Sequence, residues 1–142
     1  MRKLILTVAL ASIAFAASAQ THTSPIGKWK TLDDKTDKPM TVTEVYMTKN
    51  GTMAAKIVEN LGLPAICTTC SDEHKDKPVV GMVTLWNMSE KNGVWGGGKG
   101  YKPSEDTNFK VKSIKLVDGG NKLEVTGCKS IFCRTGTWVR AN

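Results

Sequence analysis

This sequence is a succession of short segments rich in Val, Ile, Thr and aromatic residues, each bounded by a turn-forming cluster. Apolar and polar residues alternate along these segments as in strands, and no segment keeps a helical period. The separators include Asn50-Gly51 and Asn92-Gly93, whose residues accept the positive φ of tight hairpin turns. The sequence therefore predicts an antiparallel meander. Its expected strands are 26–32, 40–47, 52–59, 79–86, 94–101, 108–117, 122–128 and 134–140.

Two irregularities in the alternation refine this prediction. Phe109 and Val111 lie on one face, whereas Ile114 belongs to the other register, so a β-bulge or a strand corner is expected at Ser113. The segment 79–86 is apolar on both faces, which predicts either a doubly buried strand or a short helix. Because short sequential strands leave exposed edges unless the sheet closes, we expect an all-β fold, a small antiparallel up-and-down barrel. An eight-stranded barrel can just hold one small ligand, and the shortness of this one leaves open whether a cavity exists.

The first residues have the pattern of a secretory signal peptide. Two basic residues precede an apolar run that ends in the small-residue cleavage pattern Ala17-Ser18-Ala19. The sequence thus predicts a cleaved signal peptide at 1–19, a disordered tail at 20–25 and a single barrel domain at 26–142. No later stretch is apolar over the roughly 18 residues that a membrane helix needs, so we expect no membrane span. The expected protein is a monomer in the periplasm or outside the cell.

The charge of the chain indicates which partners to expect. The 20 basic and 13 acidic residues give a formal charge of +7, which falls to +5 when Arg2 and Lys3 leave with the signal peptide. The remaining basic residues are spread over most strands and turns and alternate with acidic ones, and the densest run is Lys110, Lys112 and Lys115. Nucleic-acid binding is therefore not expected, whereas weak attraction to an anionic cell envelope is.

Four cysteines allow three disulfide pairings. Local bridges, Cys67 to Cys70 and Cys128 to Cys133, would each contribute about 2 kcal/mol by loop entropy, against about 4 kcal/mol for a bridge spanning some sixty residues. Loop entropy favours the long bridge, but the close spacing within each pair favours local pairing kinetically. We expect the two local bridges.

The cysteines also admit functional interpretations. A redox-active Cys-x-x-Cys normally lies where a strand enters a helix, and no such pattern surrounds Cys67. A zinc site from the four thiolates, or from Cys67, Cys70, Asp72 and His74, has donors at suitable spacing, but an oxidising compartment disfavours it. We therefore predict neither a metal nor a cofactor.

The sequence contains no recognisable catalytic constellation. His22 lies in the expected tail, and His74 lies in a charged loop without a nucleophile elbow. The carboxylate pairs, such as Glu105 with Asp106, lie in turn-like segments. The run from Gly96 to Gly100 lacks the Gly-Lys-Ser/Thr ending of a phosphate loop, and it predicts a barrel corner or a close crossing of two strands. We expect a protein that is not an enzyme.

Two motifs at the ends of the expected domain resemble the signature by which lipocalins close the base of their barrel. They are Gly27-Lys28-Trp29 in the first expected strand and Trp138-Val139-Arg140 in the last. An indole can fill the closed end while a guanidinium stacks on its face and binds backbone carbonyls. The resemblance implies that Gly27, Trp29 and Arg140 close the barrel.

From about residue 25 to residue 140 the chain also resembles a bacterial envelope family, domain of unknown function 2147. The shared motifs are Pro78-Val79-Val80-Gly81-Met82, Trp95-Gly96-Gly97, Gly127-Cys128, Cys133-Arg134-Thr135 and Trp138-Val139-Arg140. This sequence departs from the family at Lys102-Pro103, where relatives usually have Asp-Pro, and at Phe109 in place of a following Gly and Tyr. The family is lipocalin-like and has no assigned reaction, so the resemblance implies a fold without naming an activity.

With Trp29 and Trp138 assigned to the base, other aromatic and methionine side chains are available to the interior and the mouth. The candidate ligand-lining residues are Tyr46, Met53, Met82, Trp86, Trp95 and Phe109. We expect a non-catalytic exported barrel that binds a small hydrophobic or amphipathic ligand or an envelope component. The alternatives are a protein–protein interaction module of the cell envelope and a thiol-disulfide redox protein that uses Cys67 and Cys70.

Overall fold

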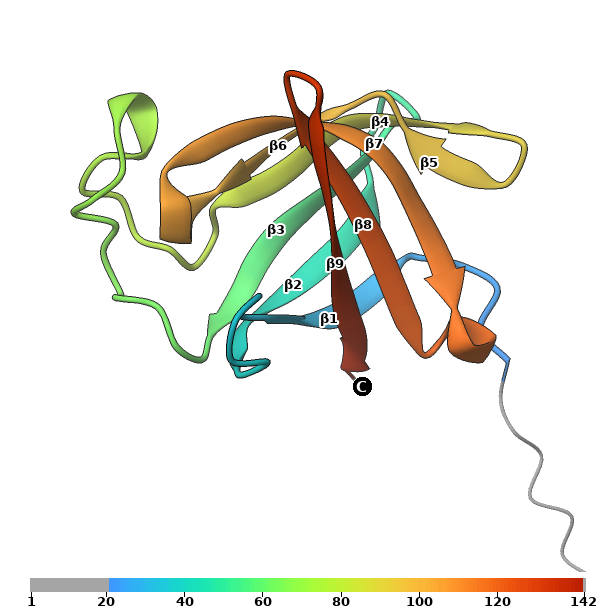
Figure 1. Cartoon of the computed structure of the whole chain (residues 1–142), viewed down its shortest axis with the longest axis horizontal. Coiled ribbons are helices and arrows are strands. Elements are labelled where there is room, and N and C mark those ends of the chain that lie inside the picture. The colour runs from blue at the N-terminus through green and yellow to red at the C-terminus, as the bar shows by residue number, and fades with distance from the viewer. Residues whose placement is uncertain (1–20, 142) are drawn as a thin grey trace, which may run out of the picture.

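The computed structural model describes residues 21–141, so the predicted signal peptide lies outside the described residues. Within this part the chain forms nine strands of one sheet, together with three single-turn 3₁₀ helices (Figure 1). The strands are β1 (Gly27–Leu32), β2 (Pro39–Met47), β3 (Met53–Asn60), β4 (Val83–Lys91), β5 (Val94–Gly96), β6 (Lys99–Lys102), β7 (Thr107–Val117), β8 (Lys122–Lys129) and β9 (Phe132–Ala141). The short helices are η1 (Asp72–His74), η2 (Pro103–Glu105) and η3 (Asp118–Gly120).

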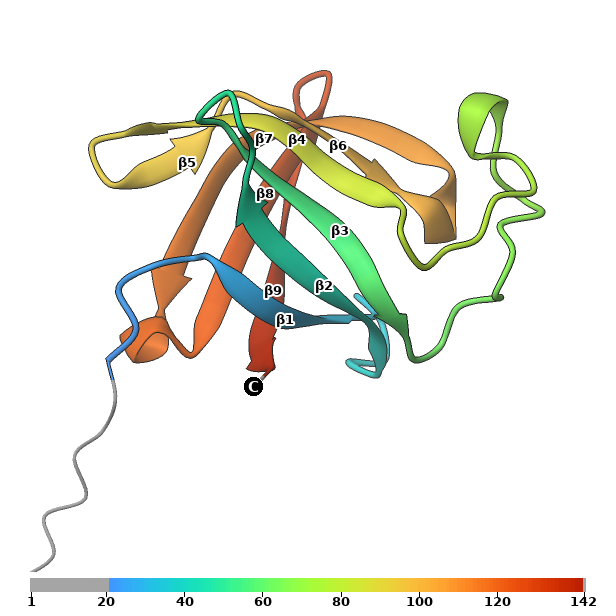
Figure 2. The ribbon, with the colours of Figure 1, turned by 180° about the vertical axis from the view of Figure 1, so that it is seen from behind.

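The sheet closes on itself into an antiparallel barrel. Except for β5 and β6, neighbours in sequence pair with one another, and β1 pairs with β9 to complete the ring, with Trp29 opposite Arg140. The strands β5 and β6 share one place between β4 and β7, so the ring has eight positions. The views from the two sides in Figures 1 and 2 show the strands curving around one interior. The expected all-β up-and-down barrel is confirmed.

One expected strand is placed wrongly. The segment 79–86 does not begin a strand at Val79, because the backbone turns at Gly81, where φ is +94°, and β4 begins only at Val83. Gly81 donates a backbone hydrogen bond to the carbonyl of Ile57, which fixes this turn against β3. Val79 and Met82 are buried beneath the preceding loop. The apolar character of both faces therefore reflects a buried turn rather than a doubly buried strand or a helix.

The expected bulge and barrel corner are both present. The pairing of β7 with β8 shifts register between Val111 and Ser113. Directly across from this shift, Gly97 has a φ of +76° and separates β5 from β6, and its amide donates to the carbonyl of Val111. A Cβ on Gly98 would overlap the backbone carbonyl of Trp86 on β4. The glycine run is thus a corner where strands cross closely.

The base of the barrel is filled by one stacked pair. Trp29 is fully buried, and the guanidinium carbon of Arg140 lies 4.1 Å from its ring centroid. The indole Nε1 donates to the carbonyl of Pro25 at 2.8 Å, and Nε of Arg140 donates to the carbonyl of Gly120 at 2.8 Å. Burial lowers the pKa of Arg140. A Cβ on Gly27 would lie only 3.2 Å from Nη1 of Arg140, so the close stacking depends on this glycine.

The described part of the expected tail, residues 21–25, lies across the base. The amide of His22 donates to the carbonyl of Gly119 at 3.0 Å, and Nη2 of Arg140 donates to the carbonyl of Ser24 at 3.0 Å. Residues 21–25 form neither helix nor strand, and these hydrogen bonds hold them against the end of the barrel. Gln20 lies outside the described residues.

Candidate functional site

The main pocket opens at the end of the barrel opposite Trp29. Since the strands run alternately up and down, four connections meet there, namely 33–38, 61–82, 103–106 and 130–131. The pocket that they surround has a volume of about 1070 Å³ and extends inward to Leu85 and Val125. The core is packed around Trp29, and the pocket takes up the opposite end of the barrel, so the structure has a cavity at the mouth.

An aromatic ring forms part of the apolar wall. Phe109 on β7 points inward, opposite Gly100 on β6 and beside Gly127 on β8. A Cβ on Gly100 or on Gly127 would overlap the Phe109 ring. The two glycines thus make the space in which the ring lies. Further along the same wall, Trp138 contributes a second aromatic surface to the pocket.

A row of threonine hydroxyls forms part of the polar wall. Oγ1 of Thr41 lies 2.7 Å from Oγ1 of Thr31 and 3.0 Å from Oγ1 of Thr43. Thr31 is directly opposite Thr41 in the β1–β2 pair, which explains their contact. Two hydrogen bonds use two of the three hydroxyl hydrogens, so one donor and several lone pairs are left to meet a ligand.

A charged cluster joins two of the loops around the mouth. Nζ of Lys102 donates to Asp34 in the β1–β2 loop and to Oε1 of Glu105 at 2.8 Å. Desolvation lowers the pKa of Lys102, but the hydrogen bonds to Asp34 and Glu105 outweigh it and leave the pKa raised. Nη1 of Arg134 lies 3.8 Å from the same Oε1 of Glu105. Lys102 thus holds this side of the mouth together.

Both expected local disulfides are present, Cys67 with Cys70 and Cys128 with Cys133. The second bridge joins residues that lie directly opposite each other at the tip of the β8–β9 hairpin. Because the thiolates are bridged, the zinc alternative loses its donors. Within residues 21–141 no three His, Cys, Asp or Glu side chains are grouped as metal ligands.

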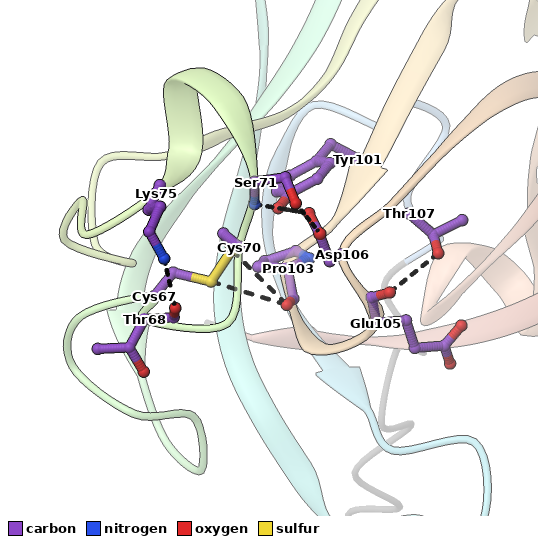
Figure 3. Close-up of a disulfide and its surroundings, with 10 residues drawn as sticks. All are labelled: Cys67, Thr68, Cys70, Ser71, Lys75, Tyr101, Pro103, Glu105, Asp106 and Thr107. Carbon is purple, nitrogen blue, oxygen red and sulfur yellow. Dashed lines mark hydrogen bonds between the residues drawn. A yellow bond between two sulfur atoms is a disulfide. The ribbon is translucent and has the colours of Figure 1, made fainter.

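The first disulfide fastens the 61–82 loop to the barrel (Figure 3). Cys67 and Cys70 are only 6% and 2% exposed, and both sulfurs lie 3.8 Å from the carbonyl oxygen of Pro103 in η2. Next to the bridge, Ser71 donates to Asp106 from its amide at 3.0 Å and from its hydroxyl at 2.5 Å. The loop, which extends from one side of the barrel in Figure 1, is therefore anchored at its cysteines.

A buried tyrosine completes this anchor. Oη of Tyr101 donates to Oδ1 of Asp106 at 2.8 Å, and the His74 ring stacks on the Tyr101 ring with centroids 3.9 Å apart. Burial, followed by the hydrogen bond to Asp106, raises the pKa of Tyr101 to about 12. The hydrogen bonds from Ser71 and then Tyr101 lower the pKa of Asp106. The neutral phenol and the ionised carboxylate are thus the forms that hold the loop.

This anchor predicts a pH window. A raised phenol pKa contributes stability that is complete below pH 10 and is lost as pH rises through about 12. A lowered carboxyl pKa contributes stability above the ordinary value of 3.8 that is lost as pH falls through the lowered pKa. Asp106→Asn is expected to bring the pKa of Tyr101 to a value between 10 and about 12. Tyrosinate absorbance in a Tyr46→Phe background measures it; an unchanged pKa would show that burial alone sets it.

The structure places the six candidate ligand-lining residues in different surroundings. Phe109 lines the main pocket, whereas Met82 and Trp86 line a smaller hollow of about 460 Å³ beside the 61–82 loop. Met53 is buried in the core, and Tyr46 and Trp95 line neither of these two hollows. Met53 does not reach the pocket because its end of β3 lies in the packed half of the barrel. Tyr46 follows inward-facing Val45 and so lies on the outer face, with Nζ of Lys56 5.1 Å from its ring centroid.

Other residues that line the mouth pocket were not predicted from the sequence. Trp138, assigned to the base from its position near Arg140, lines the mouth pocket instead. That Thr41 and Thr43 face inward could have been predicted, since they share the strand face of Val45. Threonine is common on both faces of strands, so the pattern gave no reason to prefer the pocket.

A closed antiparallel barrel with one filled end and one open end defines a lipocalin-like protein. The fold is similar to the solved structure of HP1028 from Helicobacter pylori, described as belonging to the lipocalin family, with a TM-score of 0.68 and 20% sequence identity over 82% of each chain. The pattern of the family "Uncharacterized protein conserved in bacteria (DUF2147)" matches residues 27–140, and the chain belongs to this family. A comparison with curated proteins found no match. None of the helices among residues 21–141 is long and apolar enough to cross a bilayer.

Proposed function

We propose that this protein is a non-catalytic, exported binding protein that holds one small amphipathic or hydrophobic molecule in its mouth pocket. The observation that carries the proposal is the pocket itself, whose volume of about 1070 Å³ is just above the usual range for small-molecule sites, about 300–1,000 Å³. The signal-like N-terminus and the two disulfides support export, since such bridges persist in oxidising compartments.

The composition of the walls favours an amphipathic occupant. Phe109 and Trp138 offer apolar surface, the threonine row offers hydroxyls, and Lys102 lies among carboxylates at the rim. A molecule with an apolar body and a polar end can satisfy these regions together. By contrast, the redox alternative is weakly supported, because reactive cysteines are accessible and Cys67 and Cys70 are buried.

Gly136→Phe is expected to block the pocket. Gly136 lies on the inward face of β9 opposite Val125, and a Cβ there would meet only Oδ1 of Asp34, at 4.0 Å. The added ring therefore projects into the pocket without striking backbone. We expect it to weaken binding of a fluorescent fatty acid by at least about tenfold, which is about 1.4 kcal/mol. Fluorescence titration of the purified protein measures the change.

The matched control adds the same ring outside the barrel. Lys115→Phe alters an exposed residue on β7 and is expected to leave the affinity unchanged. Native mass spectrometry of the protein purified from its own cell envelope provides an independent measurement, with a bound small molecule as the expected result. A protein that purifies empty and binds the probe equally with or without the Gly136→Phe substitution would overturn the proposal.

A further inference from the structure

The most exposed large apolar side chains of the described chain are neighbours at one hairpin tip. Ile131 is 85% exposed and Phe132 is 75% exposed, whereas the other exposed large apolar residues reach at most 50%. Both belong to the β8–β9 connection, the red loop that projects from the top of the barrel in Figure 1. Isolated exposed apolar residues are ordinary, but two adjacent ones at a projecting tip indicate a contact surface.

The tip is held in this exposed form. The disulfide between Cys128 and Cys133 closes the hairpin immediately below it, and Lys129 pairs with Phe132 in the last rung of the ladder. Ser130 has a φ of +57°, which makes the turn tight. A bridged, paired hairpin keeps Ile131 and Phe132 exposed at the edge of the mouth.

Cations surround the apolar tip. Lys129 and Arg134 flank it in sequence, and on the outer face Lys110 lies opposite Cys128 while Lys99 lies opposite Lys110. Like charges directly opposite in an antiparallel pair are destabilising. Among the ion pairs formed within residues 21–141, none includes Lys99, Lys110 or Lys129. An anionic surface would relieve this repulsion.

We propose that the β8–β9 tip docks the protein on an anionic lipid surface. Ile131 and Phe132 enter the boundary between headgroups and acyl chains, while Lys129, Arg134 and the Lys99–Lys110 pair meet the lipid phosphates. Phe132 and Arg134 also line the mouth pocket, so docking brings the mouth beside the lipid. The inference does not depend on what the pocket holds.

Flotation with vesicles tests this proposal. The purified protein is expected to float with vesicles of equal parts phosphatidylglycerol and phosphatidylethanolamine and to bind pure phosphatidylcholine much more weakly. The double variant Ile131→Ser/Phe132→Ser is expected to partition about a hundredfold more weakly, about tenfold for each side chain. Because both substituted residues are exposed, the core of the barrel is unchanged. Met47→Ser, 44% exposed at the end of β2 nearest the base, is the control and should float normally.

A second set of measurements tests the contribution of the lysines separately from the insertion of the tip into the lipid. Lys99→Gln and Lys110→Gln are each expected to lower the affinity for anionic vesicles about fivefold. In a Phe132→Trp variant, brominated lipids should quench fluorescence beyond the wild-type level. Gly136→Phe should float like the wild type, which separates this proposal from that of a ligand in the pocket.

Two results of these experiments would contradict the proposal. Flotation unaffected by the tip substitutions, or no flotation of the wild type with anionic vesicles, would overturn lipid docking. If light scattering showed instead that the tip variants abolish a dimer while leaving flotation unchanged, the tip would be a contact between two copies.

Discussion

Replacing Trp29 with alanine is expected to lower the free energy of unfolding by about 3–5 kcal/mol, the range for removing a large aromatic side chain from a core. Trp29 is fully buried at the base, where it stacks with Arg140 and donates to the carbonyl of Pro25. Its loss opens a cavity and also removes the surface on which the guanidinium of Arg140 lies. Urea denaturation followed by far-ultraviolet circular dichroism measures the change.

Trp95→Ala is the matched comparison, because Trp95 is only partly buried against the same core. We expect a clearly smaller loss of unfolding free energy there. Equal losses would contradict the view that the stacked pair at the base is a principal support of the barrel. Trp29→Phe separates packing from the hydrogen bond, because it retains an apolar ring while removing the bond to Pro25.

Much of the barrel could be predicted because its signals are local. Asn50-Gly51 and Asn92-Gly93 occur at turns with positive φ at each glycine, and each turn joins two paired antiparallel strands. The bulge at Ser113 was readable because the apolar register changes there. These features depend on residues a few positions apart, and the chain's local preferences agree with the closed sheet.

The mouth could not be predicted as well, because its contacts join distant segments. Lys102 lies 68 residues from Asp34 in sequence, and only closure of the barrel brings them together. Cys67 and Cys70 could be paired from their spacing, but their contact with Pro103 depends on where the 61–82 loop returns to the barrel. Aromatic and methionine content therefore indicated an apolar interior without showing which side chains face the pocket.

A substitution in the glycine run of residues 96–100 is also expected to lower stability strongly. Gly98→Ala is expected to lower the free energy of unfolding by about 2–4 kcal/mol, because its Cβ would overlap the carbonyl of Trp86 and approach the amide of Met88 to 2.9 Å. Both obstacles are backbone atoms of β4, so a side-chain rotation cannot remove them. The strand itself has to shift within a closed sheet.

Gly136→Ala is the control for this substitution. Its Cβ faces open space, and no positive φ constrains it, so we expect a change within about 1 kcal/mol, in the stabilising direction through the unfolded chain. Urea denaturation of both variants, with the slopes compared, measures the difference. A phosphate-loop interpretation of residues 96–100 would attribute the glycines to a ligand and predict little loss of stability in the unliganded protein. A corner where two strands cross closely predicts a large loss of stability. Equal urea midpoints for Gly98→Ala and Gly136→Ala would therefore contradict the structural explanation of the glycine run.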